Sequence, residues 1–257
     1  SLIREFGIKK PLSKGCDSVD AVRSMLDQEV SVFLSMGGNF ISAMSDTNAT
    51  AKAIRNCSLT VQISTKPNRS HLVTGKTGII LPCLGRTERD DSGGKEQFVT
   101  VENSMGVVHR SIGTRPPASN NLRSETNIVS GIAMAIEKQI GLSRIKWDEL
   151  ASDYDAIRDS IERVIPGFES YNERSRRDGG FYLPNPPRDS RTFPTNTGLA
   201  NFIPNDLASI FVKEGEFLMM TIRSHDQYNT TVYTENDRYR GIYGGRRVIL
   251  MNITDME

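Results

Sequence analysis

Cysteine is scarce in this sequence, and its few copies lie far apart. The 257 residues contain three, at Cys16, Cys57 and Cys83. This excludes a disulfide scaffold, and it leaves no C-x-x-C pair for zinc, an iron–sulfur cluster or a redox dithiol. The three histidines also lack the spacing to cysteine or carboxylate that a metal site needs. Each cysteine is therefore predicted to be a passive thiol.

Long hydrophobic runs and an excess of one charge are absent as well. The longest apolar runs are strand-sized, such as Val30–Met36, and the first residues do not read as a signal peptide. With 32 Lys+Arg against 31 Asp+Glu, the net charge of +1 gives no general attraction to nucleic acid or to an anionic membrane. We expect a cytoplasmic protein with no membrane span and no nucleic-acid partner. Because the sequence begins with Ser1 instead of methionine, it is also expected to be a piece of a longer protein.

Strands and helices alternate in the first part of the chain, which predicts βαβ units and a parallel, Rossmann-like sheet. Ser18 and Asp46 are the expected N-caps of the first two helices. The predicted strands are Val30–Met36, Leu59–Ser64 and Ile79–Leu81, and the predicted helices are 18–29, 46–56, a short stretch near 68–73, 127–140 and 147–165.

After the third predicted strand, residues 84–96 read as an exposed loop, while 97–102 and 106–112 look extended. The composition changes in the last third of the chain, where proline becomes frequent near residue 184. We predict an α/β class with these boundaries: a dinucleotide-gripping domain at 1–168, a linker or long loop at 169–197 and a partial β-barrel region at 198–257. The extended runs of that last region are Gly198–Ile203, Phe217–Ile222, Thr230–Thr234 and Val248–Met251.

Glycine follows the first predicted strand at the point where open α/β sheets bind ligands. Gly37, Gly38 and Asn39 lie between this strand and the next helix, where backbone N–H groups can approach a phosphate closely. The alternative is an ordinary tight turn, because the full G-x-G-x-x-G pattern is missing. After the second strand, Ser64, Thr65 and Lys66 begin a polar run that suits a sugar, a phosphate or a guanine edge, or else caps the next helix.

The densest polar run of the chain is 223–231 (RSHDQYNTT), which follows the apolar segment Phe217–Ile222. Its guanidinium, imidazole, amide and hydroxyl groups could hold a large anionic heterocycle. A solvated loop is the alternative. His225 and Asp226 are not predicted to work as an acid–base pair, since neighbours on an extended chain point to opposite sides.

Six segments, in this order and with this spacing, carry a resemblance that spans essentially the whole chain. They are 32–40 (VFLSMGGNF), 64–71 (STKPNRSH), 80–88 (ILPCLGRTE), 101–105 (VENSM), 222–231 (IRSHDQYNTT) and 238–242 (RYRGI). Together they resemble molybdopterin oxidoreductases of the formate-dehydrogenase-like branch, and the segment around Arg223 is the most specific part.

The resemblance implies a molybdenum or tungsten ion held by two pterin–guanine dinucleotides in the parent enzyme. An α/β domain would grip one nucleotide, and a C-terminal β-barrel would cover the pterins. The residues implied as cofactor-binding are Gly37, Gly38, Asn39, Ser64, Thr65, Lys66, Arg223, His225, Gln227, Asn229, Thr230 and Thr231.

The sequence departs from this family in two ways. Nothing matches the family's iron–sulfur cysteine motif or its metal-ligating residue, and family chains continue beyond the last residue of this one. We therefore expect a C-terminal fragment whose partner is the rest of its own polypeptide, and whose parent acts on a small-molecule substrate. By itself the fragment is expected neither to catalyse nor to retain the cofactor.

Two alternatives remain. One is a stand-alone nucleotide-binding module or accessory subunit without catalysis, which the missing metal ligand favours. The other is an unrelated Rossmann-like enzyme with a nucleotide or sugar-nucleotide substrate, which the match at 223–231 argues against.

Overall fold

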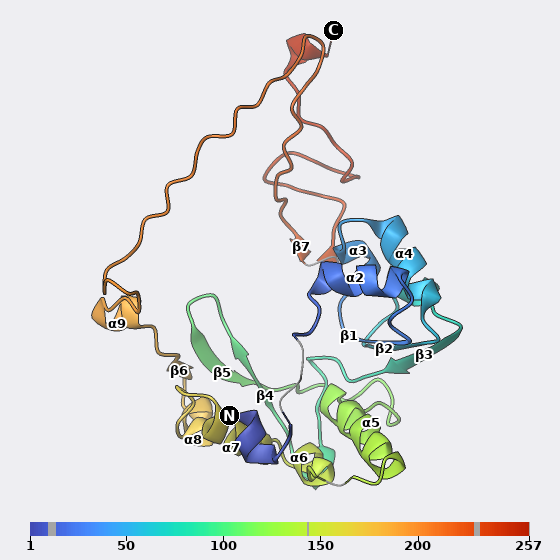
Figure 1. Ribbon diagram of the computed structural model, residues 1–257, viewed down its shortest axis with the longest axis vertical. Helices are drawn as coiled ribbons and strands as arrows, with labels where there is room; N and C mark the ends of the chain where they lie inside the picture. The colour runs from blue at the N-terminus through green and yellow to red at the C-terminus, as the bar shows by residue number, and fades with distance from the viewer. Residues whose placement is uncertain (10–13, 143, 229–231, 257) are drawn as a thin grey trace.

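The computed structural model describes residues 1–9, 14–142, 144–228 and 232–256. A parallel sheet and an antiparallel sheet, each accompanied by helices, organise the chain up to α9 (Pro186–Ser190) (Figure 1). Beyond α9 the chain first runs away from both sheets and then turns back, so that β7 is drawn beside α2 and α3 in this view, and the C-terminus lies at the far end of the extension (Figure 1). The predicted class is confirmed: a mixed α/β fold with a parallel sheet, followed by an incomplete β region.

The parallel sheet has the strand order β1-β2-β3, so consecutive strands are neighbours. Its register places Met36 beside Ile63 and Ser64 beside Pro82, which brings the carboxyl ends of all its strands to one edge. β2 is the central strand and its inner residues are buried, as expected for a parallel sheet. The strands are β1 (Val32–Met36), β2 (Leu59–Ser64) and β3 (Thr77–Pro82).

One face of this sheet is covered by α2 (Ser18–Leu26) and α4 (Thr47–Asn56), which pack on each other. Asp46 caps α4 as predicted, accepting a hydrogen bond from the N–H of Ala49. For α2 the predicted cap and end were wrong. Asp17 is the N-cap, because its carboxylate accepts from two backbone N–H groups of the first turn, and the helix stops before Gln28, whose φ is +62°. The short α3 (Phe40–Ala43) and the 3₁₀ turn η1 (Arg69–Leu72) follow β1 and β2.

The antiparallel sheet has the order β4-β5-β6 and packs against α8. Val108, Tyr171 and Phe181 are buried together at this contact. Residues 171–182, predicted to be part of a linker or long loop, thus contain a helix and a strand, because two aromatic side chains anchor them to β5. The elements are β4 (Val99–Glu102), β5 (Val107–Ser111), β6 (Phe181–Tyr182) and α8 (Tyr171–Arg176).

The single helix predicted over 147–165 is two helices, α6 (Trp147–Ser152) and α7 (Tyr154–Val164). Asp153 breaks the run because it adopts extended dihedrals and caps α7, accepting from the N–H of Asp155. The buried amide of Gln97 bridges the break: it donates to the carbonyl of Ser152 and accepts from the N–H of Tyr154, at 2.8 and 3.1 Å. The remaining elements of this part are α1 (Leu2–Phe6), which contacts α7, the 3₁₀ turn η2 (Ser92–Gly94), and α5 (Glu125–Gln139), which contacts α6.

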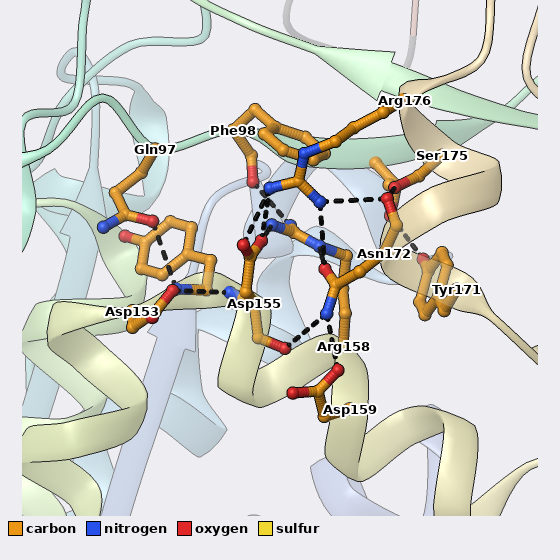
Figure 2. Close-up of polar contacts among 12 residues, drawn as sticks. Gln97, Phe98, Asp153, Asp155, Arg158, Asp159, Tyr171, Asn172, Ser175 and Arg176 are labelled. Atoms are coloured by element: carbon orange, nitrogen blue, oxygen red, sulfur yellow. Dashed lines mark hydrogen bonds and ion pairs between the residues drawn. The ribbon is translucent and has the colours of Figure 1, made fainter.

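Two arginines stack at one phenylalanine and tie α7, α8 and β4 together (Figure 2). Arg158 is 5% exposed; it lies 3.8 Å from the centre of the Phe98 ring and donates to the Phe98 carbonyl at 2.9 Å. Arg158 and Arg176 both pair with Asp155. Asn172 accepts from both arginines and donates back to α7. Arg176, which lies in the predicted linker or long loop 169–197, is thus a structural anchor.

The region after α9 has little regular structure. β7 (Gln227–Tyr228) and β8 (Val232–Tyr233) form an antiparallel pair, and η3 (Ile253–Asp255) is a single 3₁₀ turn. Within the described residues, the predicted strands Gly198–Ile203, Phe217–Ile222 and Val248–Met251 pair with nothing, and no barrel closes. In none of the described helices does an apolar stretch reach the length that crosses a membrane.

Candidate functional site

The turn after β1 has a backbone that glycine alone adopts readily. Gly37 and Gly38 have φ of +66° and +67°, in the left-handed region. The N–H of Gly37 donates to the carbonyl of Ile63 at 2.8 Å, which extends the pairing of β1 with β2. A side chain built on Gly38 would meet nothing within 4 Å, so space is open over the backbone of this turn.

The loop after β2 is fastened to this turn. Asn68 donates from its amide to the carbonyl of Gly38 at 2.7 Å. Ser70 donates to the side-chain oxygen of Asn39 at 2.9 Å and accepts from the N–H of Ile41, so it caps α3 from another loop. The Asn39 side chain is therefore buried, and its oxygen is already engaged in a structural hydrogen bond. The two predicted loops form one unit at the carboxyl edge of the sheet.

The polar residues that begin this second loop differ in what they can offer a ligand. Ser64 donates to the carbonyl of Lys66 at 2.9 Å, while the side chain of Lys66 points to solvent. His71 accepts the N–H of Asn68 on Nδ1 at 2.9 Å, and its Nε2 is buried without a hydrogen-bond partner among the described groups. Lys66 and Arg69 are both exposed, so they are the cations that the described loop 64–71 can offer a ligand beside the turn.

A cleft of about 360 Å³ lies at the same carboxyl edge, next to Thr65. The sequence analysis missed most of its lining, which comes from the loop after β3 and from the start of α5. Tyr154 donates to Asp90 and bonds Ser124, each at 2.6 Å; burial raises the pKa of the Tyr154 hydroxyl, and its bond to Asp90 raises it further. The signal that could have found this cleft is positional, since Leu84–Arg86 follows the third parallel strand.

Two ionisable side chains near this cleft, Glu88 and Cys83, have pKa values that their surroundings shift. Glu88 accepts backbone N–H groups from Gly85 and Ala118, both at 2.5 Å, and these hydrogen bonds lower its pKa. Burial, followed by the charges of Glu125 and Glu88, raises the pKa of the Cys83 thiol to about 11. Cys83 is thus protonated at neutral pH, as the predicted passive thiol would be.

A second cluster surrounds His225 in the C-terminal region. Asp237 is fully buried and accepts the N–H of His225 at 3.1 Å and the Arg240 guanidinium at 3.1 Å. Burial raises the pKa of Asp237, but these hydrogen bonds lower it by more, so the carboxylate stays charged. The ring of His225 lies 4.2 Å from that of Tyr239, and Arg246 donates to the His225 carbonyl.

The predicted binding residues of this region are placed unequally. Arg223 is exposed, and Gln227 lies in β7. Asn229, Thr230 and Thr231 lie outside the described residues. The contacts described for His225 come from residues 237–246, so this cluster is built separately from the Gly37 turn. Nowhere in the described ranges do three or more His, Cys, Asp or Glu side chains group so that they could hold a metal ion.

The parallel sheet with polar loops at its carboxyl edge defines a Rossmann-like α/β unit. No family model matches the chain. The chain is 52% identical over 258 aligned positions to proteins described as uncharacterized oxidoreductases in Mycobacterium tuberculosis and Mycobacterium bovis, covering all of this chain and 33% of theirs. It is 42% identical over 252 positions to the protein YdeP of Escherichia coli, covering 96% of this chain and 32% of that protein. The chain therefore spans about a third of the length of the curated relatives it matches.

Proposed function

We propose that this chain is the nucleotide-gripping part of a molybdopterin-dependent oxidoreductase of the formate-dehydrogenase-like type. In this proposal the Gly37 turn and the loop after β2 bind the guanine-dinucleotide end of a bis-pterin molybdenum cofactor, and the 223–231 loop reaches its pterin and phosphate. The observation that most directly supports this proposal is the open backbone of the Gly37–Gly38 turn at the carboxyl edge of a parallel sheet.

The donor set of this edge fits a diphosphate. Phosphate oxygens accept from backbone N–H groups, hydroxyls and cations; here the glycine turn, the Thr65 hydroxyl and the exposed Lys66 ammonium lie at neighbouring strand ends. Asn39 contributes by locking the turn through Ser70, since its own side chain is already engaged. Lys66 thus supplies charge, and Gly37 and Gly38 supply close approach.

The relatives support the class of reaction. The mycobacterial relatives are named oxidoreductases, and they are about three times as long as this chain, so the rest of such a polypeptide has room for the metal ligand and substrate site. When bound, the cofactor supplies two-electron redox chemistry at its metal, and the residues described here position and retain it. We propose the remaining polypeptide as the partner of this part, a small molecule as the parent's substrate, and the cytoplasm as its location.

Guanosine diphosphate (GDP) tests the nucleotide half of this proposal. GDP is expected to raise the melting temperature of the chain, because a ligand that binds the folded state stabilises it by about 2.7 kcal/mol at a hundredfold excess over Kd. Lys66→Gln removes one charge-assisted contact of about 1.5 kcal/mol and should raise the Kd for GDP roughly tenfold. Lys52→Gln, an exposed lysine on α4, is the matched control. No shift at millimolar GDP, or equal losses in both variants, would contradict the proposal.

A stand-alone nucleotide-binding module is the second candidate, favoured by the lack of a metal-holding cluster in the described residues. Both candidates predict GDP binding, so the reading frame that encodes the chain separates them. A longer frame with cysteine motifs upstream supports the oxidoreductase, whereas a frame that ends with this chain supports the module.

A further inference from the structure

His225 has two neighbours that compete for the same ring nitrogen. Arg240 Nη1 lies 3.0 Å from Nδ1, and the Asp237 Oδ1 atom lies 3.6 Å from it. A guanidinium can only donate, whereas a carboxylate can only accept. Nδ1 therefore carries a lone pair when it faces Arg240 and a proton when it faces Asp237, and the shorter contact favours the arrangement in which Nδ1 accepts from Arg240.

The other contacts of the pair explain why Arg240 prevails. The same Arg240 Nη1 also donates to Asp237 Oδ2 at 3.1 Å, so the carboxylate holds the guanidinium against the ring. Asp237 Oδ1 is left buried without a hydrogen-bond partner among the described groups. A buried carboxylate oxygen without a partner is costly, and once Arg240 is removed it can accept a hydrogen bond from Nδ1–H of the neighbouring imidazole.

We infer that Arg240 and Asp237 are positioning residues that hold His225 as the neutral tautomer with its proton on Nε2. The histidine side chain is 51% exposed, and the Tyr239 ring lies 4.2 Å from it. With Nδ1 occupied by Arg240, Nε2–H is the donor left for an oxygen acceptor, such as a phosphate oxygen of an anionic ligand. The opposite tautomer would turn a lone pair toward the same oxygen.

The inference rests on the proposed function for its ligand, but the tautomer itself can be measured without any ligand. Long-range ¹H–¹⁵N NMR of the ¹⁵N-labelled chain at about pH 8, above the ordinary histidine range, distinguishes bare from protonated ring nitrogens. The wild type is expected to show His225 with a bare Nδ1 and a protonated Nε2. Arg240→Ala should reverse the dominant tautomer, because the Asp237 Oδ1 atom can then accept a hydrogen bond from a protonated Nδ1.

Two further variants separate positioning from damage to the fold. Arg240→Lys keeps a donor and should restore the Nε2–H tautomer. Arg238→Ala removes the neighbouring arginine, which lies over the Tyr239 ring and bonds its hydroxyl, and should leave the tautomer unchanged. Unmoved signals from His71 and His109 report that the rest of the chain is folded. A proton on Nδ1 in the wild type, or the same tautomer in Arg240→Ala, would overturn the inference.

Adding GDP tests the ligand separately. A shift of the Nε2 proton of His225 on GDP addition, absent in Arg240→Ala, supports the donor role. If the tautomer reverses as expected but GDP moves no His225 signal, the positioning inference stands and GDP binding at this loop is refuted.

Discussion

Replacing Arg158 is the sharpest test of what holds α7 and α8 to the antiparallel sheet. We consider Arg158→Met, which keeps an apolar stem over the Phe98 ring and removes the guanidinium. Asp155 keeps Arg176, which contacts both of its oxygens at 2.7 Å, and Asn172 keeps its bond from the same arginine at 3.3 Å. The Phe98 carbonyl is the group that loses its described donor (Figure 2).

These contacts set the size of the effect. An unsatisfied buried carbonyl costs about 1–3 kcal/mol, and stripping a buried ion pair of one partner costs about 3–5 kcal/mol. Because Arg176 continues to pair with Asp155, the second cost applies in part. We expect Arg158→Met to lower the free energy of unfolding by roughly 3 kcal/mol. Arg177→Met is the control: it removes an ion pair with Glu173 whose side chains are 59% and 69% exposed, so it should cost less than about 1 kcal/mol.

Urea titration followed by fluorescence of the one tryptophan, Trp147 in α6, measures both variants. The midpoint should fall in Arg158→Met with little change in the slope with urea, which would indicate lost stability without a new unfolded state. If Arg158→Met costs no more than Arg177→Met, the reasoning that the buried guanidinium anchors these helices is refuted.

The same network gives a direction with pH. Burial raises the pKa of Asp155, but the hydrogen bonds from Arg176 and Arg158 lower it by more, so it lies below its ordinary value in the folded state. Its stabilising contribution is therefore complete above the unfolded pKa of about 3.9 and is lost as pH falls through the folded pKa. The stability difference between wild type and Arg158→Met should shrink between about pH 5 and pH 2. A constant difference over that range would be contrary to this assignment.

Two further predictions concern buried groups. Gln97→Leu should lower the free energy of unfolding by about 2 kcal/mol, because the N–H of Tyr154 loses its acceptor, while Gln139→Leu on the exposed end of α5 should change it by less than about 0.5 kcal/mol; urea midpoints that fall equally would count against the bridging role. Iodoacetamide at neutral pH should modify exposed Cys16 and leave Cys57 and Cys83 untouched until urea unfolds the chain, because burial raises the pKa of both buried thiols; mass spectrometry that finds Cys83 modified in the folded chain would contradict its burial.

Hydrophobic patterning was sufficient to predict the parallel sheet. The three strands and the α4 cap at Asp46 follow from short apolar runs and local capping chemistry, which depend on residues close in sequence. The break between α6 and α7 could not be predicted this way. Periodicity continues across Asp153, and the groups that bridge the break come from Gln97, more than fifty residues earlier.

The same limit applies to the site. The glycine turn was predictable because strand-to-helix turns at a sheet edge have a local signature, whereas the role of Asn39 was not. That side chain looks like a ligand donor in the sequence, but Ser70 engages it from a different loop. The segment 169–197 shows the opposite case: it was predicted to be a linker or long loop, but its Arg176 is an anchor, since its partner Asp155 lies on another helix.

The unpaired strands after residue 198 show where local reasoning and folding diverge most. Phe202, Ile203 and Met220, which lie in predicted strands, have exposed fractions of 95%, 79% and 78%. A strand buries its side chains only when a neighbour supplies the other half of the hydrogen bonds and of the apolar surface. Relatives three times as long contain enough chain to supply such neighbours. The exposed apolar run therefore agrees with the proposal that this chain is one part of a longer oxidoreductase, in which further chain would complete the β region.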